Sequence, residues 1–430
     1  MVRAGIALIT FFFAGACIAA PPVPAFTTPT RVSIIKVSDK GYPQEEPFLA
    51  GSPQGALYLS LPHTRALYRS DDRAASWLTL FDTRFGAGQP NDGGTADGAI
   101  ADAGLGVVHW LGLLGAHPVS YQRSVDSGLH WSAPMALDTI ASPDRQWIAG
   151  DAAGNVIAVW EDKATQQAVS RHSSDNGRTW SDAQLITSAW AYAGAPARGA
   201  LAGEFFVPMS INNGPDSFCL EVARTRDSGR TWKLSKCIRY IGGLMGSNTA
   251  PGPLVVNFTF LAADEADNVY VVYAIPSLTG DVGSPLAPVA VYLSRSLDGG
   301  DTWQPPIRIS GGFHNAVYGW PVAGARGRVA IAYYEDKGGV SREVPSVWST
   351  RLAYSEDADA AQPHFTVGVA DAQAHVGTIC NECGDFSRLD HLGIAALPDG
   401  QVVVAWVRDG PVNPRNLDIV TARTTNLHLR

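Results

Sequence analysis

A short octet recurs along this chain and strongly limits what the chain can fold into. Its pattern is Ser/Thr-x-Asp-x-Gly-x-Thr-Trp, with clear copies at residues 124–131, 173–180, 225–232 and 296–303. A degenerate copy occupies residues 70–77, and a weaker trace begins at Ser355. The Ser or Thr hydroxyl and the Asp carboxylate can accept hydrogen bonds from the amides of a hairpin turn, and Gly accepts a positive φ. The closing Trp is expected to place its ring between adjacent sheets. The repetition therefore predicts one hairpin-based unit that is used several times.

Between the octets the pattern is that of short β-strands. No amphipathic helical stretch of useful length interrupts it, and apolar runs lie between Gly- and Asp-rich turns, for example at 156–160, 269–273, 329–334 and 402–406. Seven turn signals precede such strands, at Gly55, Gly104, 151–154, Gly203, 264–268, Gly327 and 399–400. Each signal is expected to open the second strand of a four-stranded unit, and each octet to join the third strand to the fourth.

These units predict an all-β fold, a single β-propeller of four-stranded blades with octet turns. The octet tryptophans recur about every 50 residues, and the seven turn signals favour seven blades over six. In the six-blade alternative, one unit folds differently. The last unit lacks a clear fourth strand after residues 418–425, so residues 31–37 are expected to supply it and close the ring.

Composition and charge exclude several functions. A chain of 430 residues with 46% hydrophobic and 17% charged side chains can bury a large core. A net charge of −8 and the lack of a Lys/Arg run argue against nucleic-acid binding. No segment after the N-terminus is long and apolar enough to span a membrane. We expect a monomer without a metal or other cofactor.

The N-terminus predicts export. Arg3, an apolar run at 6–13 and small residues at 14–20 predict a signal peptide within residues 1–25, followed by the propeller at 26–430. Residues 14–17 also approximate a lipoprotein cleavage box, so lipid anchoring at Cys17 is an alternative to a secreted or periplasmic protein.

Four cysteines remain in the mature chain, an even number that suggests two disulfides in an exported protein. Cys219 and Cys237 flank an octet almost symmetrically, so they are expected to pair across one hairpin. Cys380 and Cys383 are expected to close a small loop. A redox Cys-x-x-Cys or half of a zinc site are rival interpretations, but neither a βαβ pattern nor a second such pair accompanies them.

Candidate site residues lie where the first strand of each unit begins and the second ends, because these points converge on one mouth of a propeller channel. Second-strand ends carry Glu-Asp-Lys at 161–163 and 335–337 and Arg-Asp at 408–409. The candidate catalytic residues are Asp144, Tyr334, Glu335, His391 and Asp409. The candidate substrate-binding residues are Arg145, Arg198, Arg388, Trp147 and His314. Arginines bind carboxylates in a bidentate manner, so the set favours an acidic sugar. A carboxyl group or His391 would transfer the proton, with Tyr334 as nucleophile or base.

The octet resembles the Asp box of sialidases and related β-propellers. The segment Asp-Arg-Gln-Trp-Ile-Ala-Gly-Asp at 144–151 is similar to one in bacterial sialidase-like proteins that carry BNR repeats, and 384–386 is similar to their closing Gly-Asp-Tyr. The resemblance covers nearly all of the mature chain. It implies an exported sialidase-superfamily propeller that acts on or recognises extracellular glycans. Authentic exo-α-sialidases carry an early Phe/Tyr-Arg-Ile-Pro segment and a Tyr nucleophile assisted by Glu, but residues 32–37 lack that segment and Phe386 stands where a late Tyr would be expected.

Several activities remain open on this sequence. The catalytic versions are glycoside hydrolysis of the exo-α-sialidase type and lyase cleavage of an acidic polysaccharide. The non-catalytic versions are a glycan-binding propeller and a protein-binding scaffold. In the last version the charges around the channel only neutralise one another, as structural ion-pair networks do. The octets are expected to lie on the opposite face and to have no catalytic role.

Overall fold

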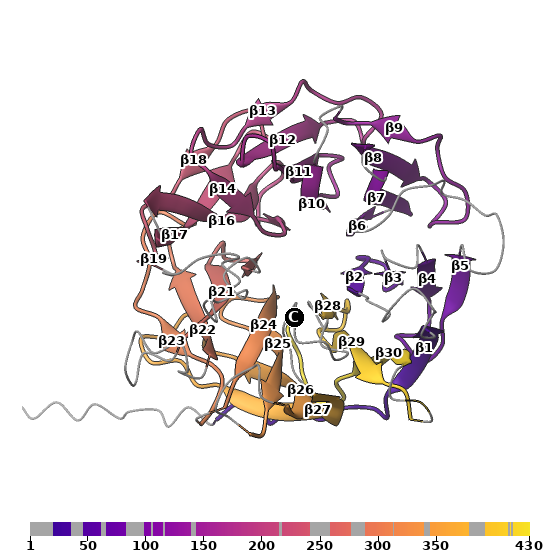
Figure 1. Cartoon of the computed structure of the whole chain (residues 1–430), viewed down its shortest axis with the longest axis vertical. Coiled ribbons are helices and arrows are strands. Elements are labelled where there is room, and N and C mark those ends of the chain that lie inside the picture. Colours follow the sequence, from indigo (N-terminus) through magenta and orange to yellow (C-terminus); the bar gives the residue numbers. More distant parts are fainter. Residues whose placement is uncertain are drawn as a thin grey trace, which may run out of the picture.

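The computed structural model describes residues 20–35, 46–61, 66–82, 99–104, 106–114, 117–138, 143–214, 217–240, 259–276, 289–312, 314–338, 345–377, 392–411, 413 and 416–430. Every regular element in these ranges is a β-strand. The strands form seven antiparallel sheets arranged as a ring around a central axis (Figure 1). The protein is therefore a seven-bladed β-propeller, as the turn signals predicted. Within these ranges, no helix has the length and hydrophobicity needed to cross a membrane.

Each blade runs from an inner first strand to an outer fourth strand. Blades 1 to 3 are β2 (Phe48–Gly51), β3 (Leu57–Leu61), β4 (Ala66–Ser70), β5 (Leu78–Asp82); β6 (Ala99–Gly104), β7 (Val107–Leu114), β8 (His117–Ser124), β9 (Met135–Ala136); and β10 (Pro143–Gly150), β11 (Val156–Asp162), β12 (Gln167–Ser173), β13 (Gln184–Leu185). Blade 4 has a divided first strand, β14 (Ala191–Ala193) and β15 (Ala197–Arg198), then β16 (Phe205–Gly214) and β17 (Ser217–Thr225), and a divided fourth strand, β18 (Lys233–Leu234) and β19 (Arg239–Tyr240).

Blades 5 and 6 repeat the four-stranded pattern, and blade 7 completes it with a strand from the other end of the chain. Blade 5 is β20 (Phe260–Ala263), β21 (Val269–Pro276), β22 (Val289–Ser296) and β23 (Ile307–Arg308). Blade 6 is β24 (Ala316–Ala323), β25 (Val329–Asp336), β26 (Ser346–Ser355) and β27 (Thr366–Gly377). Blade 7 is β28 (Gly393–Ala396), β29 (Val402–Asp409), β30 (Leu417–Arg423) and β1 (Thr30–Ile35).

The ring is closed by β1, which forms the fourth strand of blade 7. It pairs with β30 from Thr30 opposite Thr421 to Ile35 opposite Leu417. An isolated bridge between Phe26 and Thr424 continues the pairing beyond the strand. The predicted closing strand is thus confirmed. Closure by hydrogen bonding between the two ends of the chain leaves no blade with an open inter-blade gap.

The octets form the turns between third and fourth strands, with the predicted hydrogen bonds. In blade 3, Asp175 accepts from the amide of Thr179 at 2.9 Å and from its hydroxyl at 2.7 Å. Ser173 Oγ accepts from the amide of Gly177 at 2.9 Å. Gly177 has φ 73°, and a Cβ there would collide with the hydroxyl of Tyr121 in blade 2. The ring of Trp180 packs against the same tyrosine with centroids 4.8 Å apart, so each turn also joins two blades.

The two imperfect octets keep this architecture by substitution. In blade 6, Asp357 accepts from the amide of His364 at 2.8 Å and contacts its ring, so the histidine takes the place of Thr. In blade 1, Ala74 adopts φ 65° where other octets have Gly. Its methyl group is buried against Leu397 and Val403 of blade 7, so apolar contact at the closing seam offsets the backbone strain.

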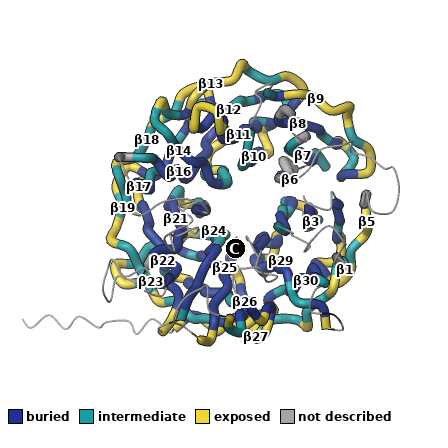
Figure 2. The backbone as a smooth tube through the Cα atoms, viewed as in Figure 1, coloured by how far each residue is buried: buried dark blue, intermediate teal, exposed yellow. Residues whose placement is uncertain are grey.

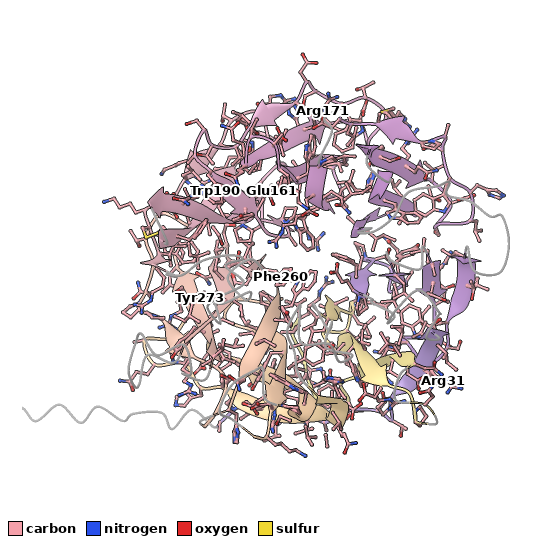
Figure 3. The ribbon with its side chains drawn as sticks, in the orientation of Figure 1. Arg31, Glu161, Arg171, Trp190, Phe260 and Tyr273 are labelled. Carbon is pink, nitrogen blue, oxygen red and sulfur yellow. A yellow bond between two sulfur atoms is a disulfide. The ribbon has the colours of Figure 1, made fainter. Side chains whose placement is uncertain are left out.

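The core lies between blades and around the second strands. Every residue of β11 and of β25 is buried, whereas exposed residues gather at the outer rim (Figure 2). A disulfide joins Cys219 in β17 to Cys237, with Cα atoms 5.6 Å apart, at the outer part of blade 4 (Figure 3). This confirms one predicted pair. Cys380 and Cys383 lie outside the described residues.

Four aromatic rings close the central channel. Phe48, Trp147, Phe260 and Trp320 come from the first strands of blades 1, 3, 5 and 6, yet their ring centroids lie between 3.9 and 6.2 Å apart, with Phe260 and Trp320 stacked. Rings from non-adjacent blades can meet only near the axis, where Figure 3 labels Phe260. This aromatic plug divides the channel into an upper mouth, where first strands begin, and a lower end on the octet face.

Candidate functional site

Pairing within the blades shows which predicted residues belong to the upper mouth. Asp144 near the start of β10 lies opposite Glu161 near the end of β11, and Ala316 at the start of β24 lies opposite Glu335. Asp409 ends β29 at the same level. Most of the predicted polar positions in the described residues therefore gather at one end of the channel, distributed over blades 3, 6 and 7.

A β-bulge shapes the mouth at blade 3. The pairing of β10 with β11 shifts between Asp144 and Trp147, and Arg145 within the bulge has φ 51°. Blade 6 has the same device, because β24 shifts between Val317 and Trp320 and Tyr318 has φ 57°. Bulges re-aim side chains, and here each one turns a tryptophan into the plug. The strain at Arg145 is the cost of holding this arrangement.

The first group of polar residues joins blades 3 and 4. The Arg145 guanidinium lies over the ring of Tyr192 in β14, with Cζ 5.3 Å from the centroid. Its Nε is 3.9 Å from Glu161 Oε2, a loose contact. Lys163 Nζ lies 2.6 Å from Asp144 Oδ2, a tight pair. Glu161 is labelled on the inner side of the ring in Figure 3, near Trp190 of the next blade. This group has two cations, two carboxylates and a phenol.

Burial controls the protonation of this group. Glu161 is only 3% exposed, and this desolvation raises its carboxyl pKa to about 7, although Arg145 opposes the shift. The pKa of Tyr192 is also raised, first by burial and then by the charge of Glu161. Near neutral pH, Glu161 can therefore donate or accept a proton, whereas Tyr192 stays protonated.

The second group lies in blade 6. Arg351 Nε on β26 is 2.6 Å from Glu335 Oε2, and Glu335 is 4% exposed. Burial raises the pKa of Glu335, against the opposing charges of Arg351 and His314. Two separately predicted residues, Glu335 and His314, are thus close enough at the mouth for their charges to interact. The carboxylate is engaged by an arginine that the sequence did not indicate.

The third group joins blades 6 and 7. His375 Nδ1 on β27 is 2.9 Å from Asp409 Oδ1, and the amide of Val376 donates to Asp409 Oδ2 at 2.9 Å. Arg408 bridges Asp371 at 3.9 Å and Asp418 at 3.4 Å. Asp409 therefore has an inter-blade structural role in this structure, which does not suit the proton transfer expected of it.

Three predicted residues do not reach the upper mouth. Tyr334 is completely buried, and its hydroxyl accepts from the amide of Val407 at 3.3 Å, so it cannot contact a solute as nucleophile or base. Trp147 is 5% exposed within the plug and donates to the carbonyl of Ala193 at 3.1 Å. Arg198 is paired opposite Phe205 at the beginning of β16, which is the lower end of the channel. Arg388 and His391 lie outside the described residues.

The sequence did not predict two residues of the mouth, Tyr192 and Arg351. Tyr192 is the middle residue of a three-residue strand without a turn signal, and Arg351 lies on a third strand, whereas the predicted site residues lie at the beginnings of first strands and the ends of second strands. The Glu-Asp-Lys triplets at 161–163 and 335–337 were the available signal for Glu161 and Glu335. In the described ranges, no three His, Cys, Asp or Glu side chains are grouped in a way that could hold a metal ion.

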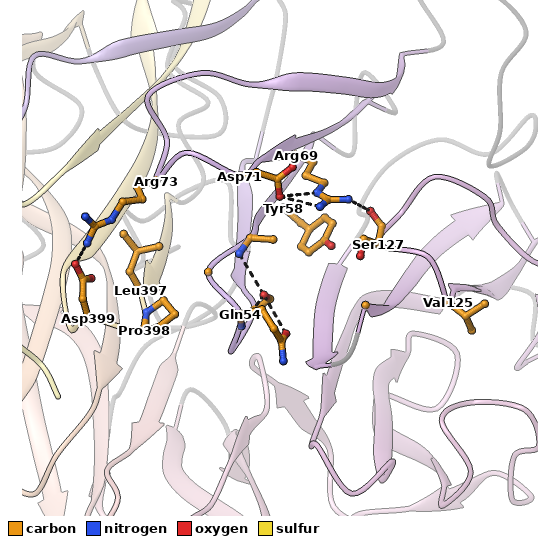
Figure 4. Close-up of a pocket in the computed structure, with 14 residues that line it drawn as sticks. Gln54, Tyr58, Arg69, Asp71, Arg73, Val125, Ser127, Leu397, Pro398 and Asp399 are labelled. Atoms are coloured by element: carbon orange, nitrogen blue, oxygen red, sulfur yellow. Dashed lines mark hydrogen bonds and ion pairs between the residues drawn. The ribbon is translucent and has the colours of Figure 1, made fainter.

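A separate cavity of about 670 Å³ lies on the octet face, between blades 7, 1 and 2. Its charges are already paired: Arg69 contacts Asp71 within blade 1 at 2.8 Å, and Arg73 of blade 1 contacts Asp399 of blade 7 (Figure 4). Arg69 also donates to the carbonyl of Ser127 in blade 2 at 3.1 Å. These contacts join three consecutive blades, so the polar walls of this cavity have a structural explanation.

Comparisons with known proteins support the fold. No protein-family model matches the sequence, and no curated protein is similar to it. An ulvan lyase of polysaccharide lyase family 25, bound to -[GlcA(1-4)Rha3S]-, has a similar structure with TM-score 0.52 and 12% identity, covering 94% of this chain and 96% of that one. A protein of unknown function from Dyadobacter fermentans gives TM-score 0.49 and 13% identity over 93% and 99% of the two chains. A leech intramolecular trans-sialidase gives TM-score 0.44 and 13% identity over 93% and 69%.

The chain thus shares its β-propeller fold with the ulvan lyase. At these identities the likeness concerns the fold alone.

Proposed function

We propose that this chain is an exported propeller that binds acidic glycans at its upper mouth and exchanges a proton with them through Glu161. The observation that carries the proposal is the buried Glu161 carboxyl, whose pKa is raised to about 7, beside the Arg145 guanidinium. A carboxyl group with a pKa near neutrality is suited to both donate and accept a proton. An arginine next to it supplies the charge that an acidic sugar requires.

The pair of Arg145 with Glu161 is longer than the pairs that Asp144, Glu335 and Asp409 form at the same mouth. Arg145 Nε and Glu161 Oε2 are 3.9 Å apart, whereas the pairs at Asp144, Glu335 and Asp409 have separations of 2.6 to 2.9 Å. Breaking a long ion pair costs less free energy than breaking a short one, so Arg145 can exchange its contact with Glu161 for a contact with a ligand more readily. We therefore assign substrate contact to Arg145, proton exchange to Glu161, and orientation of the guanidinium to Tyr192.

Two further observations support an acidic glycan outside the cell. The structurally similar ulvan lyase is bound to a saccharide that contains GlcA, an acidic sugar. The disulfide between Cys219 and Cys237 suits an oxidising compartment, in agreement with the predicted signal peptide at residues 1–25. Glycoside hydrolysis and lyase cleavage both need a group that exchanges a proton, so either reaction is compatible with Glu161.

The second candidate function is recognition of a glycan or a protein without turnover. The tight pairs of Lys163 with Asp144, Arg351 with Glu335 and His375 with Asp409 favour it, because ion pairs within the protein stabilise a rigid mouth and not a reaction. In this version Arg145 still binds the anionic group, and Glu161 only shapes the site.

The test is an acidic-glycan array, followed by turnover assays with the glycans that bind. Lyase products are followed by ultraviolet absorbance of the unsaturated sugar, and hydrolysis of sialosides by a fluorogenic leaving group. We expect Arg145→Ala to abolish binding, and Glu161→Gln to abolish turnover while binding persists. Arg178→Ala, which removes an exposed arginine on the octet face, is the control. Binding without turnover in the wild type would favour the second function. No binding of any acidic glycan would refute the proposal and leave only the protein-binding version of the second function.

A further inference from the structure

The lower end of the channel forms a second pocket, on the other side of the aromatic plug from Arg145. Its volume is about 270 Å³, and it is lined by the later parts of first strands from all around the ring, including residues 49–51, 148–150, 261–263 and 394–396. Trp320 contributes to the lining and stacks on Phe260, so the plug borders the pocket on the side of the upper mouth. A ligand there is separated from the upper mouth.

The charged side chains that line this pocket are all positive. Arg198 and Arg430 line it, and no Asp or Glu side chain is among its lining residues. Arg198 is exposed in β15, whose main chain pairs with β16, and its side chain forms no ion pair or hydrogen bond with any other residue in the described ranges. The chain as a whole has a net charge of −8, so a pocket lined only by positive side chains is a local exception. Such a pocket attracts an anion from solution.

The acidic residues nearest in the chain are engaged elsewhere. Arg198 is followed by Gly199, whose amide donates to the carbonyl of Glu204 at 2.8 Å. The Glu204 carboxylate is 2.8 Å from Arg226 Nε, and Asp267 of blade 5 is 3.9 Å from the same guanidinium. Arg226 thus holds both carboxylates, and the Arg198 side chain stays available to the pocket.

The second arginine is held in place by its main chain. The carbonyl oxygen of Arg430 accepts from Arg328 Nη1 at 2.9 Å. The preceding residue, Leu429, donates to the carbonyl of Gly400 at 2.8 Å, and its own carbonyl accepts from the amide of Ala325 at 2.6 Å. These bonds bring the C-terminal segment between blades 6 and 7 to the centre of the ring (Figure 1). A fixed backbone beside the axis restricts where the Arg430 guanidinium can go.

We propose that this lower pocket binds a small hydrophilic oxyanion, either a carboxylate such as a sugar acid or an inorganic phosphate. Guanidinium groups recognise both through charge-assisted hydrogen bonds. The first strands are the innermost of each sheet, so their free edges face the channel and offer main-chain donors as well. A volume of about 270 Å³ corresponds to roughly nine waters, which suits a single sugar acid and excludes a polymer.

The experiment is isothermal titration calorimetry at constant ionic strength, with sodium phosphate in one arm and sodium glucuronate in the other. We expect at least one of the two to bind the wild type, and Arg198→Ala to raise the dissociation constant at least about tenfold, as expected for a lost hydrogen bond between charged groups. Arg198→Lys keeps the charge and should retain part of the affinity. Arg145→Ala removes the proposed upper-mouth contact, so binding that it leaves is assigned to the lower pocket. Arg178→Ala, which removes an exposed arginine of an octet turn, should bind like the wild type.

The two arms separate the possible sources of the oxyanion. Phosphate binding alone would assign a tetrahedral anion to the pocket, and glucuronate binding alone would assign a carboxylate; either result supports the proposal. Binding of neither anion at millimolar concentration would overturn it, as would an affinity that Arg198→Ala leaves unchanged. Because the Arg198 side chain has no hydrogen bond or ion pair to lose within the described residues, circular dichroism of the variant should match the wild type. Loss of binding in Arg145→Ala but not in Arg198→Ala would instead place the anion at the upper mouth.

Discussion

Replacement of Glu161 by Gln should make the protein more stable at alkaline pH without changing it at acidic pH. The carboxyl group is 3% exposed, and its pKa is raised from 4.5 to about 7, mainly because burial disfavours the charged form. Gln has nearly the same shape as the protonated Glu side chain and carries no charge at any pH. The variant therefore separates the cost of ionising this residue from the cost of removing its side chain.

The magnitude follows from the two pKa values. Each pKa unit corresponds to about 1.36 kcal/mol, so a rise of about 2.5 units gives about 3 kcal/mol, or about 2 kcal/mol with allowance for solvent screening at the mouth. Below about pH 4.5 Glu161 is protonated in both the folded and the unfolded chain, and this stabilisation is fully present. It is lost as the pH rises through about 7, because the folded state holds the proton more tightly than the unfolded state.

The assay is guanidinium-induced unfolding at about pH 5 and about pH 8, with Glu265→Gln, an exposed carboxylate, as the control. Wild type and control should lose about 2 kcal/mol more than Glu161→Gln over this interval. If the free energies of unfolding of the wild type and Glu161→Gln differ by the same amount at both pH values, the raised pKa is refuted, and with it the acid–base role of Glu161. Such a result would leave the anion-binding role of Arg145 untouched.

Three further predictions concern the bulge, an octet and the disulfide. At position 145, with φ 51°, Gly should be more stable than Ala by about 1 kcal/mol in thermal unfolding, and equal stability would contradict the backbone strain. Trp180→Ala should destabilise by about 3 kcal/mol while glycan binding by the folded fraction is retained; lost binding at unchanged stability would make the octet face the functional one. Reduction of the Cys219–Cys237 bridge, whose cysteines are 18 residues apart, should cost about 3 kcal/mol, and alkylation of both cysteines in the non-reduced protein would show that the bridge does not form.

The fold was predictable because its determinants are local and repeated. Each octet closes its own turn with side chains four residues apart, as Asp175 and Thr179 do, so sequence alone identifies the turn. Gly55, Gly154 and Gly203 all have positive φ at first-to-second strand turns, and such positions favour Gly. In blade 2 the positive φ falls on Gly106 and not on the predicted Gly104. The closing strand was predictable because β30 required a partner.

The site was less predictable, because it depends on irregularities that have no local signal. Arg198 was placed at the start of a strand, but the first strand of blade 4 is divided into β14 and β15, and Arg198 ends the second part. Tyr334 was expected to reach the channel mouth as nucleophile or base, and Tyr333 precedes it in the same strand. Both tyrosines are fully buried. Successive side chains of a strand point to opposite faces of the sheet, but neighbouring blades cover both faces of a second strand, so neither face is exposed.

The two bulges explain both where ligands can bind and why Trp147 was misjudged. In blades 3 and 6, two bulge residues precede the tryptophan that returns to the pairing, opposite Val159 and Ala332 respectively. Each bulge directs its tryptophan to the axis, where the rings meet those of Phe48 and Phe260. In blade 3, the same irregularity lifts Arg145 over Tyr192 at the upper mouth. The bulge in blade 3 therefore has two consequences. It adds Trp147 to the plug, and it positions Arg145, the proposed anion contact, on the opposite side of the plug from the lower pocket. Trp320 belongs to the plug and also lines the lower pocket. Because closely packed rings transmit strain, we expect a substitution at Trp320 to alter both the lower pocket and the upper mouth.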